Sequence, residues 1–229
     1  MKRIIGILLT LLTISSVGFA SPLNDFSQGK IAIDISVRPN PDLKMTENSP
    51  WSKTFDGKNS MEYDVAFGLG NNFAFQYRKA DLKSNYIENV YGNLATHNGT
   101  IATQEFNVLY KLNNTYSLFT GIKQIQEQLH DGGKTYESDT RTHWQLGITG
   151  QVKLGKSLNS YAIIAAGKDI SAWKIGLSYA VNKNTDFNVF YAESKYNKVT
   201  HNSIISKLNI DDKADYTVKG IGYGLTYKL

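Results

Sequence analysis

The C-terminal stretch Asp215–Leu229, DYTVKGIGYGLTYKL, decides the fold. Counted back from the last residue, its side chains fall into two sets at period two. The apolar set is Ile221, Tyr223, Leu225, Tyr227 and Leu229, and the set between them is Gly220, Gly222, Gly224, Thr226 and Lys228. This alternation indicates a strand with one apolar face and one small or polar face. Such a strand fits a soluble sandwich, or a membrane barrel in which the apolar face meets lipid.

The same alternation recurs upstream, and together with the C-terminal stretch it predicts ten strands. The upstream strands are expected at residues 30–38, 61–69, 73–81, 101–112, 116–128, 142–154, 160–168, 172–181 and 187–196. Their lengths match the ~9–11 residues that a tilted transmembrane strand needs. The seventh and eighth are joined only by Asp169–Ser171 and are the hardest to separate, so eight strands is the alternative.

The predicted connections alternate in length. Tight turns rich in Asn and Gly follow strands two, four, six and eight, whereas long polar segments follow strands one, three, five and nine. The long segments include residues 39–60, 82–100 and 197–214. An up-and-down barrel with both termini in the periplasm has this rhythm, with short turns on the inner side and long loops on the outer side.

The N-terminus predicts export. Residues 1–20 have a basic start, an apolar run from Ile4 to Leu12, and small side chains at Gly18 and Ala20, as a cleaved signal peptide requires. The apolar run is shorter than the roughly 20 residues of a helical span. Residues 21–229 then form one domain. The 14 Tyr, 10 Phe and 19 Gly against 4 Pro favour strands and tight turns.

Aromatic side chains provide a third signal for a membrane. They gather near both ends of the predicted strands, as interfacial belts do, because amphipathic rings prefer the headgroup level. Those near the short turns are Phe73, Tyr110, Tyr116, Tyr161, Tyr179, Phe187 and Tyr227, and those toward the long loops are Tyr63, Tyr77, Trp144, Trp173 and Tyr191. These three signals predict an all-β protein, a closed antiparallel up-and-down transmembrane β-barrel.

In these features the chain resembles the small outer-membrane β-barrel proteins of diderm bacteria, including the outer membrane protein A transmembrane domain and porin-like barrels. Its last strand is similar to their C-terminal assembly signal, carried here by Tyr223, Leu225, Tyr227 and Leu229. The resemblance implies a Gram-negative cell envelope location in the outer membrane, reached by export through the inner membrane. It also implies contact with outer-membrane lipid and lipopolysaccharide, and with the barrel-assembly machinery during biogenesis.

The inward faces of the predicted strands carry charges of both signs. They are Asp34, Arg38, Glu62, Asp64, Arg78, Glu105, Lys123, Lys153 and Lys174. Because the interior of a ten-stranded barrel is narrow and a buried ion must be paired, these residues predict a salt-bridge network that fills the lumen. A narrow path for ions or small solutes, lined by both signs, is the alternative.

Residues suited to catalysis or metal binding are few. The histidines, His97, His130, His143 and His201, all fall in predicted outer loops or at an outer strand end. Ten-stranded barrels include the omptin proteases, which use an Asp pair and an Asp-His pair at the outer rim. The nearest elements here are His130-Asp131 and Asp211-Asp212, whose spacing and place do not match. We therefore expect no enzyme activity, metal or cofactor. The absence of cysteine excludes thiol chemistry, and a mild positive charge does not indicate nucleic-acid binding.

Three function hypotheses follow. The first is a non-enzymatic outer-membrane protein with a structural or surface-interaction role through its outer loops. The second is a small porin-like channel, which single-channel recording distinguishes from the first. The third is a barrel enzyme, a protease or a lipid-modifying enzyme, which would lose activity on mutation of His130 or His143.

Overall fold

The computed structural model describes residues 25–47, 52–90, 93–131, 134–137, 140–200 and 213–229. The predicted signal peptide, residues 1–20, lies outside these ranges. Within the described residues, no helix is long and apolar enough to span a membrane. The strands are β1 (Ile31–Arg38), β2 (Asp42–Glu47), β3 (Ser52–Gly70), β4 (Phe73–Val90), β5 (Asn93–Lys111), β6 (Tyr116–Asp131), β7 (Lys134–Glu137), β8 (Arg141–Lys153), β9 (Leu158–Gly167), β10 (Ile170–Ala180), β11 (Thr185–Thr200) and β12 (Lys213–Lys228).

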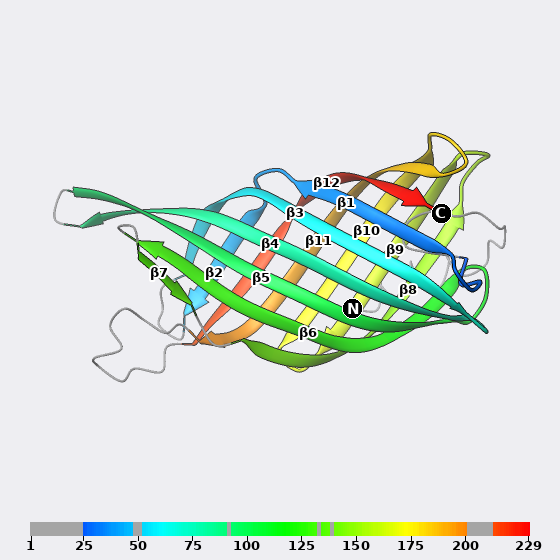
Figure 1. Ribbon diagram of the computed structural model, residues 1–229. Coiled ribbons are helices and arrows are strands. Elements are labelled where there is room, and N and C mark those ends of the chain that lie inside the picture. The colour runs from blue at the N-terminus through cyan, green and yellow to red at the C-terminus, as the bar shows by residue number, and fades with distance from the viewer. Residues whose placement is uncertain (1–24, 48–51, 91–92, 132–133, 138–139, 201–212) are drawn as a thin grey trace, which may run out of the picture.

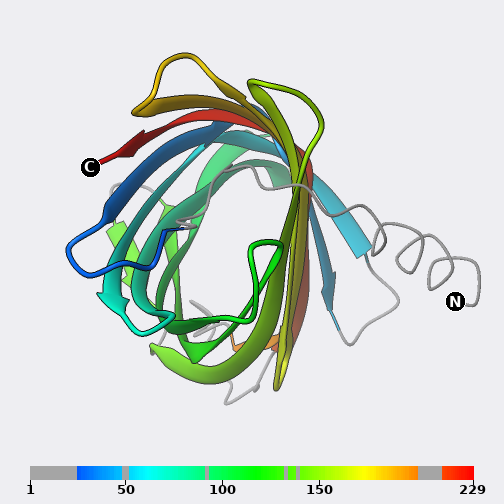
Figure 2. The same ribbon diagram turned by 90° about the vertical axis from the view of Figure 1, so that its right-hand side faces the viewer.

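The sheet closes on itself, as Figure 2 shows from the end that carries the short turns. From β3 to β12 the strands of the wall pair antiparallel in sequence order, with β6 next to β8, and β1 pairs with both β12 and β3. β2 also lies between β12 and β3, so β1 and β2 share one position in the wall, while β7 pairs with β6 beside the main path. The predicted ten-stranded, up-and-down barrel is therefore confirmed, and the eight-stranded alternative is wrong. Closure satisfies the backbone groups that an open edge would leave unpaired.

Asparagine and glycine shape the turn between β3 and β4. Gly70, Asn71 and Asn72 all have positive φ, at 85°, 53° and 67°. Asn71 and Asn72 form the two-residue turn, whose left-handed conformation matches the twist of the flanking strands. Asparagine is the residue other than glycine that adopts this conformation most readily. The C-terminus lies at the same end of the barrel (Figure 1).

At the opposite end the strands are longer than the sequence predicts. Residues 39–60 and 82–100 were expected to be loops, but β2, β3, β4 and β5 continue through most of them, and β3 and β5 each reach 19 residues. The register of β4 and β5 runs unbroken from Phe73↔Tyr110 to Val90↔Asn93. Figure 1 shows this hairpin projecting well beyond the rest of the barrel. The extension is mostly polar in sequence, which hides it from a search for apolar alternation.

The break between β1 and β2 changes which side chains point inward. In β1 the even-numbered Ser36 and Arg38 are buried, whereas after the break Leu43 is buried. Asn40 in the break has a positive φ of 44°. Pro41 packs so closely on Gly57 that a side chain at Gly57 would collide with its carbonyl oxygen. Arg38 is therefore the last inward-facing residue of β1 before the break.

The outer surface of the barrel is apolar, as the alternation predicts. The apolar side chains of the C-terminal strand, from Ile221 to Leu229, are all exposed, as are those of β3 from Met61 to Leu69. Several aromatics pair across strands, including Phe73 with Tyr110 and Trp173 with Tyr191.

Tyr161 is a correction to the predicted aromatic belt. It was expected on the outer surface, yet its side chain is only 4% exposed and belongs to a cluster inside the barrel. Gly176 on the neighbouring strand gives the ring room, since a Cβ there would lie 2.6 Å from Cζ of Tyr161. The absence of that side chain lets the ring fold inward.

Candidate functional site in the barrel lumen

A buried apolar cluster lies in the lumen toward the short-turn end. Phe26, from the segment before β1, is 3% exposed and packs with side chains that face inward from the wall. The backbone of Phe26 and Ser27 lies against Gly68, where an added Cβ would meet the Ser27 carbonyl oxygen at 2.2 Å. Other members of this cluster are Ala32, Ala66, Ala74, Leu109, Phe119, Tyr161, Ile163, Phe190 and Ala192. Phe26 lies in a mostly polar segment, where no apolar alternation marks it in the sequence.

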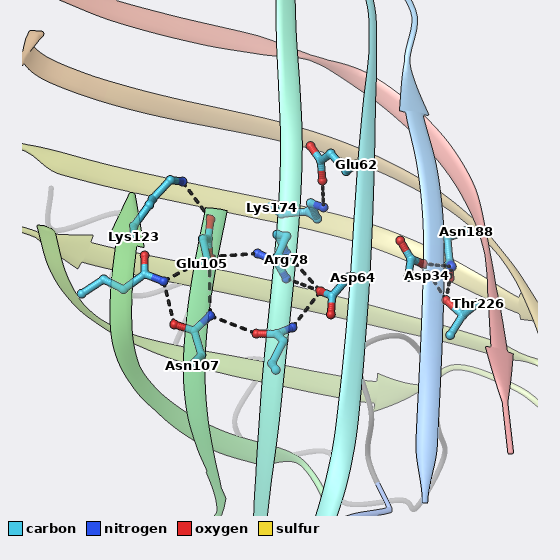
Figure 3. Close-up of polar contacts among 12 residues, drawn as sticks. Asp34, Glu62, Asp64, Arg78, Glu105, Asn107, Lys123, Lys174, Asn188 and Thr226 are labelled. Atoms are coloured by element: carbon cyan, nitrogen blue, oxygen red, sulfur yellow. Dashed lines mark hydrogen bonds and ion pairs between the residues drawn. The ribbon is translucent and has the colours of Figure 1, made fainter. Parts of the chain in front are cut away.

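A polar layer lies next to this apolar one. The strand register places Asp34, Asp64, Arg78, Glu105, Lys123 and His143 in one row across β1, β3, β4, β5, β6 and β8. Arg78 Nη2 lies 2.8 Å from Asp64 Oδ2, and Lys123 Nζ lies 2.8 Å from Glu105 Oε1 (Figure 3). Arg78 Nη1 is 3.7 Å from Glu105 Oε2, so Arg78 connects the two carboxylates.

A second group of charges lies beside that row. Glu62 accepts from two cations, with Oε1 2.5 Å from Arg38 Nη2 and Oε2 2.8 Å from Lys174 Nζ. Lys174 reaches Glu62 from the far wall of the barrel, and its ammonium lies 4.2 Å from the ring centroid of Phe190. Most of the predicted lumen charges therefore form two neighbouring clusters, one around Glu62 and one around Glu105.

The other two predicted lumen charges have different neighbours, although Asp34 is opposite Asp64 in the register of β1 and β3. Asp34 Oδ2 accepts hydrogen bonds from Thr226 Oγ1 at 2.7 Å and Asn188 Nδ2 at 3.2 Å, at the right of Figure 3. Lys153 ends β8 beside a short turn, paired in register with Asn159.

Three amide side chains bridge the ionised ones. Gln76 donates to Asp64 at 2.7 Å, Asn107 donates to Gln76 at 3.1 Å, and Gln145 donates to both Asn107 Oδ1 and Glu105 Oε2. Gly121 makes this possible, because a Cβ there would lie 2.4 Å from Asn107 Oδ1. The inward parity of these amides was readable in the sequence. Their partners were not, because they depend on the register between strands.

A second apolar cluster occupies the lumen on the other side of the charges. Its buried members are Leu43, Leu82, Ile101, Ile125, Ile170, Tyr196, Tyr216 and Val218. Tyr196 also touches the polar layer, since Lys123 Nζ lies 4.9 Å from its ring centroid. Several of these residues fall where the sequence predicted loops, so this layer was not foreseen.

A cavity of about 50 Å³ remains within the lumen. Its charged lining consists of Arg38, Glu62, Arg78, Glu105, Lys123 and Lys174. Small side chains such as Ala80, Ala165 and Ala192 complete its wall.

In the part of the chain that the structure describes, no group of three or more His, Asp or Glu side chains could hold a metal ion. His97 and His130 belong to β5 and β6 instead of loops, while His143 is in β8 and faces inward. His201 and the Asp211-Asp212 pair lie outside the described residues.

The closed barrel with an apolar exterior and a filled, polar centre defines the class: the fold is that of the outer-membrane β-barrel proteins. No protein-family model and no curated protein sequence matches the chain. Among solved structures, the outer-membrane protease OmpT of Escherichia coli superposes with a TM-score of 0.59, covering 93% of this chain and 100% of that one at 12% identity. Ail, the attachment invasion locus protein of Yersinia pestis, covers 86% and 99% with a TM-score of 0.38 at 14% identity. At these identities the likeness concerns the fold alone.

Proposed function

We propose that the protein is a non-enzymatic integral protein of the bacterial outer membrane, with a closed lumen and a surface-interaction role carried by its outer end. One observation carries the proposal. Two apolar clusters and a polar network occupy the lumen. The buried carboxylates Glu62 and Glu105 of this network form ion pairs with the cations around them. A lumen filled in this way gives ions and solutes no continuous path.

The exterior supports a membrane location. Across β4, β5, β6 and β8, one row of outward residues in register reads Tyr77, Phe106, Ile122 and Trp144, and the next row reads Lys79, Gln104, Gln124 and Thr142. A change from apolar to polar within two residues marks the boundary of the hydrocarbon region. From Leu69 to Met61, the apolar face of β3 extends about 27 Å along the strand, or about 20 Å along the barrel axis at the usual tilt. That height is close to the ~25 Å band of outer-membrane barrels.

In this location the protein contacts outer-membrane lipid along its apolar belt and lipopolysaccharide at the outer boundary. The exposed residues Tyr223, Leu225, Tyr227 and Leu229 of the last strand are the segment that we expect the barrel-assembly machinery to bind during biogenesis. This strand also completes the wall, since the Leu229 backbone N–H donates to the Ile31 carbonyl at 2.9 Å.

The outer end gives the protein its surface for partners. From Tyr77 to Val90, β4 extends about 43 Å along the strand beyond the apolar belt. Because its backbone remains paired with β5, the projection is a stiff ribbon and not a free loop. A stiff projection above a sealed barrel is suited to contacts with other surfaces or molecules.

Planar-bilayer recording of the refolded, full-length protein tests the closed lumen. The expected record shows rare, brief openings without ion selectivity. Frequent, long-lived and selective openings would refute the proposal and support the porin-like alternative. Peptide and lipid cleavage assays would test the enzyme alternative, in which activity would fall in His130→Ala or His143→Ala.

The surface role is tested by shortening the β4–β5 hairpin. Leu82 and Ile101 are paired in register, so a short turn can join them in place of residues 83–100. The variant should keep the heat-modifiable gel migration of a folded barrel. Bacteria displaying either protein at equal density would be compared for self-aggregation and for attachment to coated surfaces. Equal behaviour of the two strains would refute a surface role for this projection.

A further inference from the structure

Arg38 is a buried cation whose hydrogen-bonding capacity is only partly used. Its side chain is 3% exposed, and its Nη2 binds Glu62. Among the described residues, neither its Nε nor its Nη1 has a hydrogen-bond partner. Guanidinium N–H groups that are removed from water without an acceptor carry a desolvation cost of several kcal/mol, so an acceptor is expected beside them. Arg38 lines the lumen cavity, where such an acceptor would fit.

The charges around this cavity do not balance. Four cations line it, Arg38, Arg78, Lys123 and Lys174, against two carboxylates, Glu62 and Glu105. Two more carboxylates lie behind this lining: Asp64, which pairs with Arg78, and Asp34, which is opposite Asp64 in the register. Asp34 is four residues from Arg38 along β1, about 13 Å away, and accepts hydrogen bonds from Asn188 and Thr226.

The carboxylates near the cavity have little capacity left for Arg38. Glu62 uses one oxygen for Arg38 and the other for Lys174. Glu105 uses one oxygen for Lys123 and the other for Gln145 and Arg78. The lining of the cavity is therefore richer in cations than in carboxylates, and the N–H groups of Arg38 without an acceptor lie on this lining.

We propose that this cavity is a binding site for one small monovalent anion, of the size of chloride or bromide, held by Nε and Nη1 of Arg38. The volume of about 50 Å³ exceeds the 10–15 Å³ that one water needs, so it has room for a halide and one or two waters, but not for a sugar phosphate or a lipid headgroup. A cation is disfavoured by the positive excess. The bound anion would offset the positive excess of the cavity lining and stabilise the filled barrel. The inference does not depend on what the outer surface binds.

Diffraction provides the direct test. The full-length protein is refolded and crystallised in sodium bromide, so that the ion is enclosed as the barrel forms, and data are collected at the bromine absorption edge. The expected result is an anomalous peak inside the lumen, in contact with Nε and Nη1 of Arg38. Density in the cavity without an anomalous signal would mean water and would overturn the proposal. Bromide found only on the outer surface, an adventitious ion only, would also overturn it.

A solution experiment tests the same site without crystals. Urea unfolding is compared in sodium bromide and in sodium gluconate at equal ionic strength, since gluconate is too large for the cavity. At bromide concentrations about ten times the dissociation constant, the unfolding equilibrium constant should fall about elevenfold. A general salt effect would not give this result, because bromide strengthens the burial of apolar surface less than strongly hydrated anions do.

Two variants connect the effect to the cavity. Ala80→Val fills the cavity and keeps every charge, and Arg38→Gln removes the cation that holds the anion. Both should lose the difference between bromide and gluconate. If Arg38→Gln does not fold, Ala80→Val still decides. A bromide dependence in Ala80→Val equal to that of the wild type, or no bromide dependence in the wild type, would refute the site.

Discussion

Replacing Glu62 by glutamine removes the carboxylate that Arg38 and Lys174 share, and it changes the shape of the side chain little. Glu62 is 7% exposed at its side chain, and its two oxygens lie 2.5 and 2.8 Å from the two cations. A glutamine can still accept one hydrogen bond at its oxygen, but its NH₂ group would face the second cation. The variant therefore leaves two buried positive charges without their counter-ion.

The expected loss of stability follows from the burial of the three groups. Removal of one partner from a buried ion pair costs about 3–5 kcal/mol. Lys174 is 16% exposed and lies over the Phe190 ring, so water and the ring still stabilise its charge in the variant. We therefore expect a loss in the lower half of that range, about 3–4 kcal/mol. The matched control is Glu193→Gln, which breaks a pair with Lys195, whose side chain is 51% exposed. That pair is worth about 0–1 kcal/mol.

The assay is urea unfolding of the refolded variants in lipid vesicles, in gluconate so that no small anion replaces the lost charge. Adding Lys174→Met to Glu62→Gln should recover part of the loss, since it removes one of the two stranded cations. Equal free energies of unfolding for Glu62→Gln and Glu193→Gln would show that water reaches Glu62. The argument for a sealed, paired lumen would then fail.

Three further predictions concern the wall and its filling. Ile148→Arg, at the middle of the lipid-facing belt, should lower the unfolding free energy by about 2–4 kcal/mol. The control Ile148→Leu should lower it by less than about 1.5 kcal/mol, and comparable losses in the two variants would place Ile148 outside the lipid. Gly176→Val should displace the Tyr161 ring and cost about 1–3 kcal/mol of stability, whereas Gly155→Ala, with open space around it, should be neutral. A neutral Gly176→Val would refute the packing of Tyr161 against Gly176. Phe26→Ala should destabilise by about 3–5 kcal/mol without opening a pore, because the polar layer still blocks the lumen, and selective channels in this variant would contradict that reasoning.

The membrane part of the wall could be predicted from the sequence because lipid imposes a strict rule on it. Every second residue of a lipid-facing strand must be apolar, so β3, β8 and β12 reveal their faces and their phase. Above the belt this constraint ends. Residues 82–90 pair with residues 93–101 as strands although apolar residues do not alternate regularly along them, and a pattern search sees a mostly polar segment.

Tyr161 could not be placed because β9 is apolar on both faces. Tyr161 and Ile163 face the lumen, while Ile164 faces outward, so composition does not distinguish the two sides. The deciding factor is a glycine on another strand, Gly176, and its position opposite Tyr161 follows only from the register of β9 with β10.

The space inside the barrel could not be predicted either. The strand alternation puts Thr149 and Ser178 on the lumen face, where arginine is tolerated better than on the lipid face if there is space. In the structure Thr149 is 8% exposed and Ser178 is fully buried. Forcing a long side chain into such packing costs about 1–3 kcal/mol or more, so little advantage over the lipid face is expected.

The separate positions of the lumen network and the outer projection imply that stability and surface interaction can be altered independently. The network extends along β4 to Arg78 and includes Lys174 of β10, whereas the shortened hairpin lacks residues 83–100, beyond the Leu82–Ile101 pair. Mutations at sites that share no partners usually add within about 0.3–0.5 kcal/mol. Glu62→Gln combined with the shortened hairpin should therefore lose stability by the sum of the single changes, and its attachment should equal that of the shortened hairpin alone. Strong coupling between the two would mean that the filled lumen also sets the conformation of the outer end.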